Sequence, residues 1–426
     1  MPKILIVCPT FPPVNTPDHH RIRVSIPWFI KWEWDVTVLA VEPLYTEAPL
    51  DPVLEMAGDF CRTIRVKALP AAATRKIGLG NLGYRAWWQL RKAGTELIKQ
   101  HNFDLIYFST TVFPAMTLGR IWKKKYGIPF ILDMQDPWRN DFYLDKPKHE
   151  QPPKYKIAHF LDSKLEKWTV PYADGLIAVS ENYPQSLNKR YQINLPSAVI
   201  PFASCKADFD FVDKLEIQNP VFKRKKGRIH VVYTGAVTPG MPKPLELMFR
   251  AFKSVIDKTG LDIHLYFVGS SYAPDAQSIA MPIAQKVGID ENVTEIPERV
   301  GYFEAIKVML DADLIILPGS MEAGYTASKI YPYILSQKPI IALTHALSSV
   351  SSILKGCNTG PVITFKSEEE LKTKQEEVEI EIREIINQGK FKADTNWDYY
   401  QEYSDKRMAE KQINFFKNII KNNETE

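Results

Sequence analysis

The residues best placed for chemistry follow an apolar run in the second half of the chain. After residues 314–317 come several small residues, and then Ala327, Ser328 and Lys329 stand at the start of a run with helical spacing. A helix N-terminus exposes unpaired N–H groups and the positive end of the helix dipole, which attract anions. Ser328 can cap such a helix and Lys329 adds a full positive charge. We therefore expect a phosphate or diphosphate here, although a simple capped helix with a solvated lysine would also fit.

Two polar groups in the first half also follow strand-like runs. They are His19, His20 and Arg21 after the first run, and Asp136, Trp138 and Arg139 after a later one. Ligands of doubly wound sheets bind at the carboxyl ends of strands, so both groups are candidates for a binding site. Polar surface histidines, an aspartate that begins a turn and a core tryptophan are the structural alternatives. No carboxylates stand at ligand spacing from the histidines, so we predict no metal site.

The elements that would position these residues alternate along the whole chain. Short apolar or β-branched runs followed by longer amphipathic stretches are typical of a parallel α/β sheet. The expected strands are residues 3–8, 35–40, 63–66, 105–108, 130–133, 175–179, 198–200, 229–233, 263–268, 293–296, 314–317, 340–342 and 362–365. The expected helices are residues 22–32, 84–100, 115–126, 157–172, 244–258, 275–287, 302–312, 329–336 and 368–387.

The alternation stops at a polar segment, residues 204–227, and then restarts, which indicates two domains joined by a linker. We expect residues 1–203 to form one Rossmann-like, doubly wound domain and residues 204–396 to form a second. Residues 397–426 carry apolar side chains at mixed helical spacing. A helix there needs a surface on which to bury them, and we expect it to pack back on the first domain.

Composition excludes several classes of protein. The chain has 426 residues, of which 45% are hydrophobic and 24% charged, so it is long and apolar enough for two folded cores. The four cysteines lie far apart, so neither a disulfide framework nor a zinc site is expected. The phosphate-binding fingerprints of dehydrogenases and P-loop NTPases and the hydrolase nucleophile elbow are all missing. No apolar run is long enough to span a membrane, and we expect a soluble, cytoplasmic protein.

Charge is distributed unevenly between the two halves. Residues 1–203 hold 26 Lys and Arg against 19 Asp and Glu, whereas the remainder has a net charge of −3. Basic residues accompany tryptophans at 74–92 and 122–126, a combination that suits the interface of an anionic membrane. Helices with solvated Arg and Lys are the structural alternative. Nucleic acid is disfavoured because no recognition motif accompanies the charge.

The segment from Glu322 to Ala342 resembles the nucleotide-sugar-binding segment of family 4-like, GT-B-fold glycosyltransferases. Further similarities occur in the same order along most of the chain. They are Phe11-Pro12-Pro13, residues 35–39, residues 133–138, residues 173–180 and residues 231–235. The resemblance implies two Rossmann-like domains facing a cleft and a C-terminal helix that crosses back to the N-terminal domain. It also implies retaining transfer of a sugar from a nucleotide sugar, without a required metal or other cofactor.

The resemblance also assigns roles to residues. Glu322 and Lys329 from the second domain and Asp136 from the first would be catalytic. The donor would be bound by Gly235, Lys243, Arg299, Ser320, Gly324, Ala327 and Ser328. The acceptor would meet His19, His20, Arg21, Trp138 and Arg139, with Trp138 stacking on a sugar ring. The growing charge on the departing diphosphate is the main electrostatic demand, and Lys329 would meet it.

Two positions depart from the family pattern. Pro332 stands where an acidic residue usually accepts hydrogen bonds from the nucleotide ribose, and proline has neither a carboxylate nor an N–H. An arginine that usually follows the first strand of the donor domain is also missing, so that Lys243 and Arg299 would have to supply the positive charge.

These observations predict a hexosyltransferase-like enzyme that makes cell-surface polysaccharide or glycoconjugate. Its acceptor would be a glycan or a lipid-linked sugar, and it would work in the cytoplasm or at the inner face of the cytoplasmic membrane. Two alternatives remain open: a degenerate protein that binds a glycan or partner without turnover, and a nucleotide-sugar epimerase.

Overall fold

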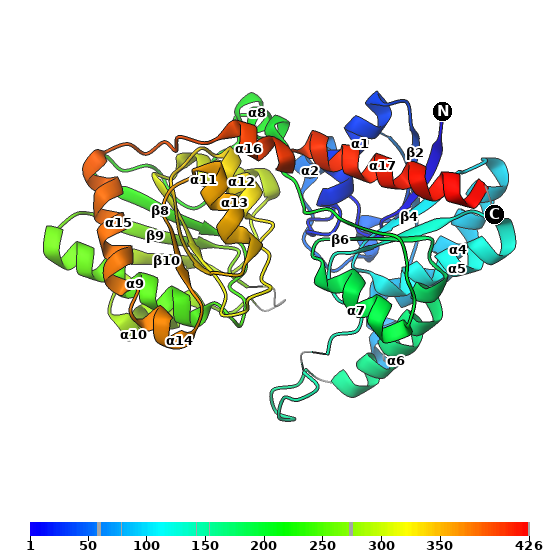
Figure 1. Ribbon diagram of the computed structural model, residues 1–426, viewed down its shortest axis with the longest axis horizontal. Helices are drawn as coiled ribbons and strands as arrows, with labels where there is room; N and C mark the ends of the chain where they lie inside the picture. The colour runs from blue at the N-terminus through cyan, green and yellow to red at the C-terminus, as the bar shows by residue number, and fades with distance from the viewer. Residues whose placement is uncertain (58–60, 78, 142, 153, 272–275, 425–426) are drawn as a thin grey trace. The chain divides into compact units, whose positions relative to one another are not determined.

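The computed structural model describes residues 1–57, 61–77, 79–141, 143–152, 154–271 and 276–424. These residues form two α/β domains, each built on one parallel sheet (Figure 1). The first domain joins residues 1–203 to the C-terminal helix, and the second spans residues 204–404.

The first sheet has seven parallel strands in the order β3-β2-β1-β4-β5-β6-β7. They are β1 Lys3–Val7, β2 Asp35–Val41, β3 Arg62–Val66, β4 Leu105–Ser109, β5 Phe130–Met134, β6 Gly175–Ala178 and β7 Ser197–Val199. The central strands are mostly apolar, since helices cover both of their faces.

The helices of the first domain pack on both faces of this sheet (Figure 1). They are α1 His20–Lys31, η1 Pro43–Tyr45, α2 Pro52–Met56, α3 Ala71–Thr74, η2 Arg75–Ile77, α4 Leu82–Gln100, η3 Phe113–Met116, α5 Thr117–Tyr126, α6 Tyr155–Thr169, η4 Val170–Tyr172, α7 Asn182–Tyr191 and α17 Asp405–Glu424. Residues of α4 and α5 share one core cluster with the sheet, and residues of α1 and α17 share the other.

The second sheet has six parallel strands in the order β10-β9-β8-β11-β12-β13. They are β8 Ile229–Thr234, β9 Ile263–Val268, β10 Val293–Ile296, β11 Leu314–Pro318, β12 Ile340–His345 and β13 Val362–Phe365. The helices are α8 Lys206–Lys214, α9 Pro242–Thr259, α10 Ala280–Val287, η5 Asp290–Asn292, α11 Tyr302–Asp311, α12 Ile330–Leu335, α13 Ser349–Cys357, α14 Glu368–Lys372, α15 Gln375–Gln388, α16 Trp397–Tyr400 and η6 Gln401–Tyr403.

Three predicted elements differ from the structure. The linker contains α8, whose Phe209 and Val212 are buried. The helix predicted at 275–287 begins at Ala280, and position 275 lies outside the described residues. The helix predicted at 368–387 is interrupted between α14 and α15, because α14 ends in a turn at Thr373.

The chain returns to the first domain at residue 405 rather than at 397. Residues 397–404 remain with the second domain because Tyr400 is buried there and the ring of Tyr403 stacks on Tyr331. α17 alone then packs on the first domain. Its buried Phe416 lies 5.0 Å from the ring of Tyr107, and Gln412 donates a 2.8 Å hydrogen bond to Ser25.

Candidate functional site

The segment that resembles a nucleotide-sugar site lies at the carboxyl edge of the second sheet. β8 and β11 are neighbours in this sheet. Strands β9 and β10 are added on one side of this pair and strands β12 and β13 on the other, so the strand order switches between β8 and β11. Ligands of doubly wound sheets bind at such points. Gly235 follows β8 directly, and Gly319 and Ser320 follow β11.

Lys329 is brought to this edge by the loop before α12. Its amino group donates hydrogen bonds to the hydroxyl of Tyr233 and to the carbonyl oxygen of Ala236, the latter at 3.1 Å. The same nitrogen lies 4.2 Å from the centroid of the Tyr233 ring. The side chain is half-buried, and burial of its ammonium lowers the pKa to about 7. Both of these hydrogen-bond partners are uncharged, so an arriving anion would favour the charged form of Lys329.

Because Gly235 has no side chain, the Lys329 side chain can pack against its backbone. Its φ of +104° is a backbone conformation that glycine adopts more readily than other residues. A Cβ at this position would lie 3.0 Å from Nζ of Lys329 and 3.1 Å from its Cε. The preceding residue is fixed as well, since Tyr333 donates to the carbonyl oxygen of Thr234 and accepts from its N–H. Burial raises the pKa of Tyr333 above its usual range.

Ser320 joins the loop after β11 to the loop after β8. Its side chain is buried, and a Cβ on Gly240 would collide with its hydroxyl oxygen. The N–H of Met321 donates to the carbonyl oxygen of Gly240 at 2.9 Å, and the N–H of Glu322 donates to Oγ of Ser320 at 3.1 Å. Glu322 and Gly324 themselves are exposed. The loop is therefore held at its base, and its tip faces solvent.

The expected capping role of Ser328 is wrong. α12 begins at Ile330, Lys329 occupies the N-cap position, and no side chain makes a capping hydrogen bond. Ser328 is exposed, whereas Ala327 is buried. The N–H of Ile330 instead donates to the carbonyl oxygen of Ala327 in a preceding turn. Anion binding here would depend on the Lys329 ammonium more than on a helix end.

The other two predicted donor-binding cations lie elsewhere in the second domain. Lys243, in the first turn of α9, is more than half exposed and forms an ion pair with Glu368 of α14. Arg299 is half-buried, and its Cα lies 3.9 Å from where a Cβ on Gly269 would stand, just after β9. Of the three cations, Lys329 is therefore the one that the structure brings to Gly235.

The carboxyl edge of the first sheet carries a polar cluster around Asp18, which the sequence analysis did not single out. β1 and β4 are the neighbours at which this sheet reverses. Oδ2 of the buried Asp18 accepts hydrogen bonds from Thr10 at 2.7 Å and from Thr110 at 3.0 Å, so the carboxylate fastens the loops after the two strands together.

The histidines predicted to meet the acceptor differ in exposure. His19 is fully buried, and burial lowers its pKa to about 4, so its imidazole is neutral at physiological pH. The ring of His20 is half-buried and lies 4.3 Å from that of His19. A ligand could reach only His20 without rearrangement of the loop.

Arg21 lies in the interior of the first domain, which argues against the predicted contact with an acceptor. Its Nε is 2.7 Å from Oδ2 of Asp133, and both side chains are almost wholly buried. Gln135 donates to the same carboxylate oxygen at 2.8 Å and to the carbonyl oxygen of Asp18 at 3.0 Å. Arg21 thus links α1 to the end of β5.

Asp136 is the predicted acceptor-side residue that remains at the surface. Although the side chain is exposed, desolvation by the surrounding protein and the negative charge of Asp18 raise its pKa to about 6. A carboxylate with a raised pKa is a better proton acceptor than an ordinary aspartate. Asp136 can therefore orient a hydroxyl group and accept its hydrogen bond.

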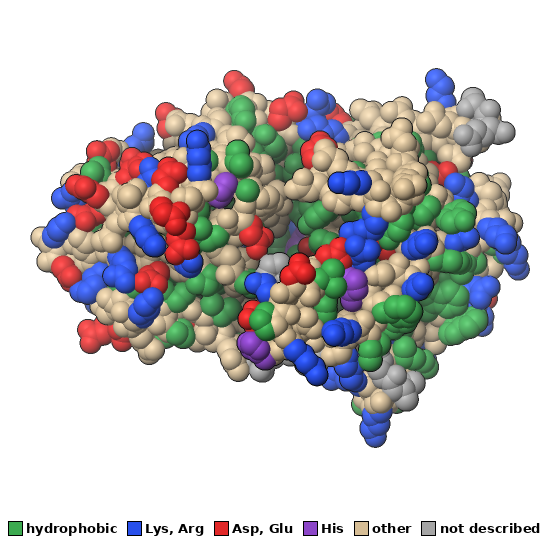
Figure 2. Space-filling view, turned by 60° about the horizontal axis from the view of Figure 1, so that its bottom comes forward, with side chains coloured by type: hydrophobic (Ala, Val, Ile, Leu, Met, Phe, Trp, Pro, Cys, Tyr) green, Lys and Arg blue, Asp and Glu red, His purple; other side chains and the backbone are tan. Residues whose placement is uncertain are grey.

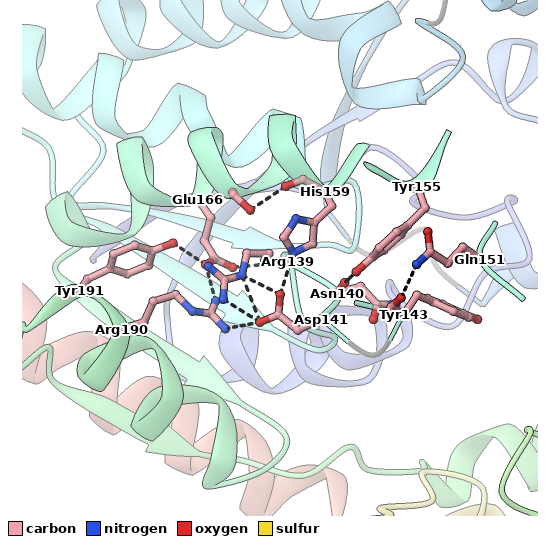
Figure 3. A network of polar contacts seen from close by, with 11 residues as sticks. Arg139, Asn140, Asp141, Tyr143, Gln151, Tyr155, His159, Glu166, Arg190 and Tyr191 are labelled. Carbon is pink, nitrogen blue, oxygen red and sulfur yellow. Dashed lines mark hydrogen bonds and ion pairs between the residues drawn. The ribbon is translucent and has the colours of Figure 1, made fainter. Parts of the chain in front are cut away.

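Trp138 and Arg139 both make contacts within the first domain, and the burial of Trp138 argues against its predicted stacking on a sugar ring. Trp138 is buried and stacks on Phe113 with ring centroids 5.6 Å apart, because the chain turns inward after Pro137. Arg139 forms two parallel hydrogen bonds to Asp141, of 2.8 and 2.7 Å (Figure 3). This pair belongs to a network that fastens the loop after β5 to α6 and α7.

The described residues contain neither a cluster suited to a metal ion nor a helix suited to cross a membrane. Within the described ranges, no group of three or more His, Cys, Asp and Glu residues is arranged to hold a metal ion. No helix in the same part of the chain combines the length and apolar character needed to cross a membrane.

Comparison with known proteins matches a family model to part of the first domain and solved structures to nearly the whole chain. Residues 23–193 match the glycosyl transferase 4-like domain. No curated protein sequence matches the chain. Its fold is similar to that of sucrose-phosphate synthase from Thermosynechococcus elongatus, with 13% identity, a TM-score of 0.54, and coverage of 99% of this chain and 97% of that one.

Two further structures are similar over nearly their whole length. Anabaena HepE, solved in complex with UDP-glucose, shares 14% identity and a TM-score of 0.57, with both chains fully covered. A UDP-forming α,α-trehalose-phosphate synthase from Burkholderia xenovorans shares 10% identity and a TM-score of 0.60, covering 98% of this chain and 99% of that one. Residues 23–193 are therefore similar to the glycosyl transferase 4-like domain, and the chain as a whole is similar in fold to GT-B glycosyltransferases.

Proposed function

We propose that this protein is a retaining glycosyltransferase that moves a sugar from a nucleotide-sugar donor to a glycan or lipid-linked acceptor. The observation that carries the proposal is the position of Lys329. Its amino group lies at the reversal point of the second sheet, against Gly235, and is held by Tyr233 and Ala236. The structural neighbour HepE was solved with UDP-glucose, which supports a donor of this class.

Lys329 would act on the leaving group. Negative charge grows on the diphosphate as the glycosidic bond breaks, and a fixed cation stabilises that charge without reorganisation. With a pKa of about 7, Lys329 would be partly neutral before the donor binds and charged afterwards. Glu322 and Ser328, both exposed on the same loop, would contact the sugar and the diphosphate.

The acceptor hydroxyl would be oriented by Asp136 in the first domain. In the retaining mechanism that we propose, the hydroxyl proton passes to an oxygen of the donor phosphate, and no protein nucleophile forms a covalent intermediate. We propose no requirement for metal. We also propose a cytoplasmic location, in cell-surface polysaccharide or glycoconjugate synthesis.

A non-catalytic binder is the second candidate, and Pro332 favours it. This residue lies inside α12, where the resemblance implies a carboxylate that binds ribose. Its ring offers no hydrogen bond to a ribose hydroxyl. Such a protein would bind a glycan or partner without using Lys329.

Calorimetric titration with UDP, GDP, dTDP, ADP and CMP, with and without divalent metal, tests the donor site. The expected result is micromolar binding of one nucleotide without metal. Lys329→Met removes the charge while keeping an unbranched side chain, and it should weaken that binding by about 1.5–3 kcal/mol, as for a charge-assisted hydrogen bond. Lys243→Met, which removes an exposed and paired lysine, is the matched control and should bind almost normally.

The outcomes separate the candidates. Binding that survives Lys329→Met unchanged would remove Lys329 from the donor site. No binding of any nucleotide by the folded protein would favour the non-catalytic binder. Mass spectrometry of the matching nucleotide sugar with a mixture of acceptors would then distinguish glycosyl transfer from epimerisation, because only transfer releases nucleoside diphosphate together with a heavier acceptor.

A further inference from the structure

Helix α6 of the first domain buries polar side chains and exposes large apolar ones. Most surface helices place apolar side chains against the core and polar ones toward water. In α6 several polar side chains point into the domain, and apolar side chains point outward. The helix is amphipathic, and the large apolar side chains of its outward face are each at least 40% exposed.

The inward face is fixed by the network of Figure 3. Glu166, which is 1% exposed, accepts hydrogen bonds of 2.5 Å from both Arg190 and Tyr191. Two turns earlier, His159 contacts Asp141 at 2.7 Å. Burial would raise the pKa of Asp141, but hydrogen bonds from Arg139 and His159 lower it below its usual value. These ionic contacts set the rotation of α6 about its axis.

The outward face carries large apolar side chains one helical turn apart. Ile157 is 63% exposed, Phe160 58%, and Leu161 and Trp168 40% each. At about 100° per residue, these positions lie within an arc of about 100° on the side of the helix opposite Glu166. Tyr172, just after the helix, is also exposed, and the guanidinium of Arg120 lies over its ring and over that of Trp168.

The charges around this apolar arc are positive. Lys156, Lys164 and Lys167 are exposed beside it. The two acidic residues of α6, Asp162 and Glu166, are half-buried and buried on the other side. We call Ile157, Phe160, Leu161, Trp168 and the three lysines the α6 face. Figure 2 shows apolar side chains interspersed with lysines and arginines over the first domain on the side in view.

We propose that the α6 face docks on the surface of an anionic phospholipid membrane. Charge complementarity favours this occupant, since exposed lysines on long stems lie among the apolar side chains and along one side of them, and can reach lipid phosphates while those side chains enter the interface. Tryptophan and tyrosine prefer the same depth, at the level of the lipid headgroups. The proposal goes beyond the proposed function, because docking requires neither donor nor acceptor.

The membrane surface predicted from sequence included residues 74–92 and 122–126, and the structure changes which residues can take part. Trp122 is buried, and the half-buried Trp87 donates its indole N–H to Thr117. Trp88 is 65% exposed, and the guanidinium of Arg91 lies 5.3 Å from its ring centroid. Trp88 can add to the contact, but the larger apolar surface is on α6.

Flotation of the full-length protein with vesicles tests this proposal. We expect binding to vesicles of phosphatidylglycerol in phosphatidylcholine at an ionic strength of about 0.1 M, and little binding to phosphatidylcholine alone. The variant Ile157→Glu/Leu161→Glu should lose at least about tenfold in binding, because two apolar groups would be replaced by charges that anionic lipid repels. Lys156→Gln/Lys164→Gln/Lys167→Gln should lose about fivefold per lysine removed.

Matched variants control for net charge and folding. Leu44→Glu/Leu347→Glu adds the same two charges at leucines that are 84% and 76% exposed outside the α6 face, and should bind normally. Lys226→Gln/Lys390→Gln/Lys392→Gln is the control for the triple lysine variant, because these three lysines are exposed but lie in the second domain. Equal losses in the α6 variants and their controls would overturn the proposal, as would no binding by the wild-type protein.

Sedimentation velocity distinguishes a membrane from a second copy of this chain as the partner of the α6 face. If Ile157→Glu/Leu161→Glu converted a dimer to a monomer and vesicles did not bind the wild type, the α6 face would be a self-association surface and the proposal would be wrong. A wild-type monomer that floats with anionic vesicles would support it.

Discussion

The amino group of Lys329 lies over the ring of Tyr233 and donates a hydrogen bond to the hydroxyl of the same residue. Tyr233 belongs to β8, whereas Lys329 stands 96 residues later, just before α12. A single tyrosine thus positions the cation that we expect to meet the donor diphosphate. Tyr233 is itself held by a 2.7 Å hydrogen bond from its hydroxyl to Ala236.

Donor binding is expected to take up a proton at Lys329. Burial lowers the pKa of the free lysine to about 7, and a bound diphosphate would raise it. Affinity should therefore be greatest below pH 7 and should fall as the pH rises above 7, by at most about tenfold per pH unit. Calorimetry of a nucleotide sugar in buffers of different ionisation enthalpy should show nearly one proton bound at pH about 8 and almost none at pH about 6. Lys329→Met should remove this uptake; if uptake persisted, another group would be responsible.

Gly235→Ala should weaken donor binding and destabilise the second domain. An alanine at φ +104° is strained, and its Cβ would press on the Lys329 side chain. We expect a loss of about 1–3 kcal/mol in unfolding free energy, measured by urea denaturation. Gly260→Ala is the control for backbone strain alone, since it also has a positive φ, of +68°, but no atom within 4 Å of the added Cβ. Equal losses of donor affinity in both variants would show that displacement of Lys329 is not the cause.

The activity is expected to depend on ionisation of Asp136. Desolvation and the charge of Asp18 raise the pKa of this carboxyl to about 6, so its charged form predominates only above that pH. If Asp136 orients the acceptor hydroxyl, kcat/KM should rise with pH up to about 6, as the carboxylate ionises, and level off above that pH. Asp136→Asn should lower kcat/KM and abolish this limb. An acidic limb that is unchanged in Asp136→Asn would assign the titration to another group.

Phe416→Ala should destabilise the first domain selectively. The ring is fully buried and contacts Phe29, Trp34 and Tyr107, so its removal should cost about 3–5 kcal/mol. Differential scanning calorimetry should show a lower unfolding temperature for one transition and no change in the transition of the second domain. Lys417→Ala, a neighbouring exposed residue on α17, should leave both unchanged. A shift of the second domain's transition alone would contradict the assignment of α17 to the first domain.

Much of the secondary structure could be read from the local sequence. Every strand predicted from an apolar or β-branched run is present, because a strand buried on both faces must be apolar along its length. The short helices α7 and α8 were missed, since their few buried residues leave little periodic signal. The helix α13 was also missed, although it buries several apolar residues. Tyr233 and Asp18 were missed for another reason: each is a single polar residue whose partners are distant in sequence.

Sequence by itself therefore determined the alternating α/β organisation, the parallel character of the sheets and the place of Lys329 after a buried strand. Hydrophobic periodicity and the ends of strands depend on residues that are neighbours in the sequence, so they can be predicted from it. The tertiary structure alone decided that Lys329 meets Tyr233 and Gly235, that Trp138 and Arg21 are interior residues, and that α6 turns its apolar side outward. Those outcomes depend on which side chains meet across the fold, because burial and long-range ionic contacts, rather than residue type, fix the direction of each side chain.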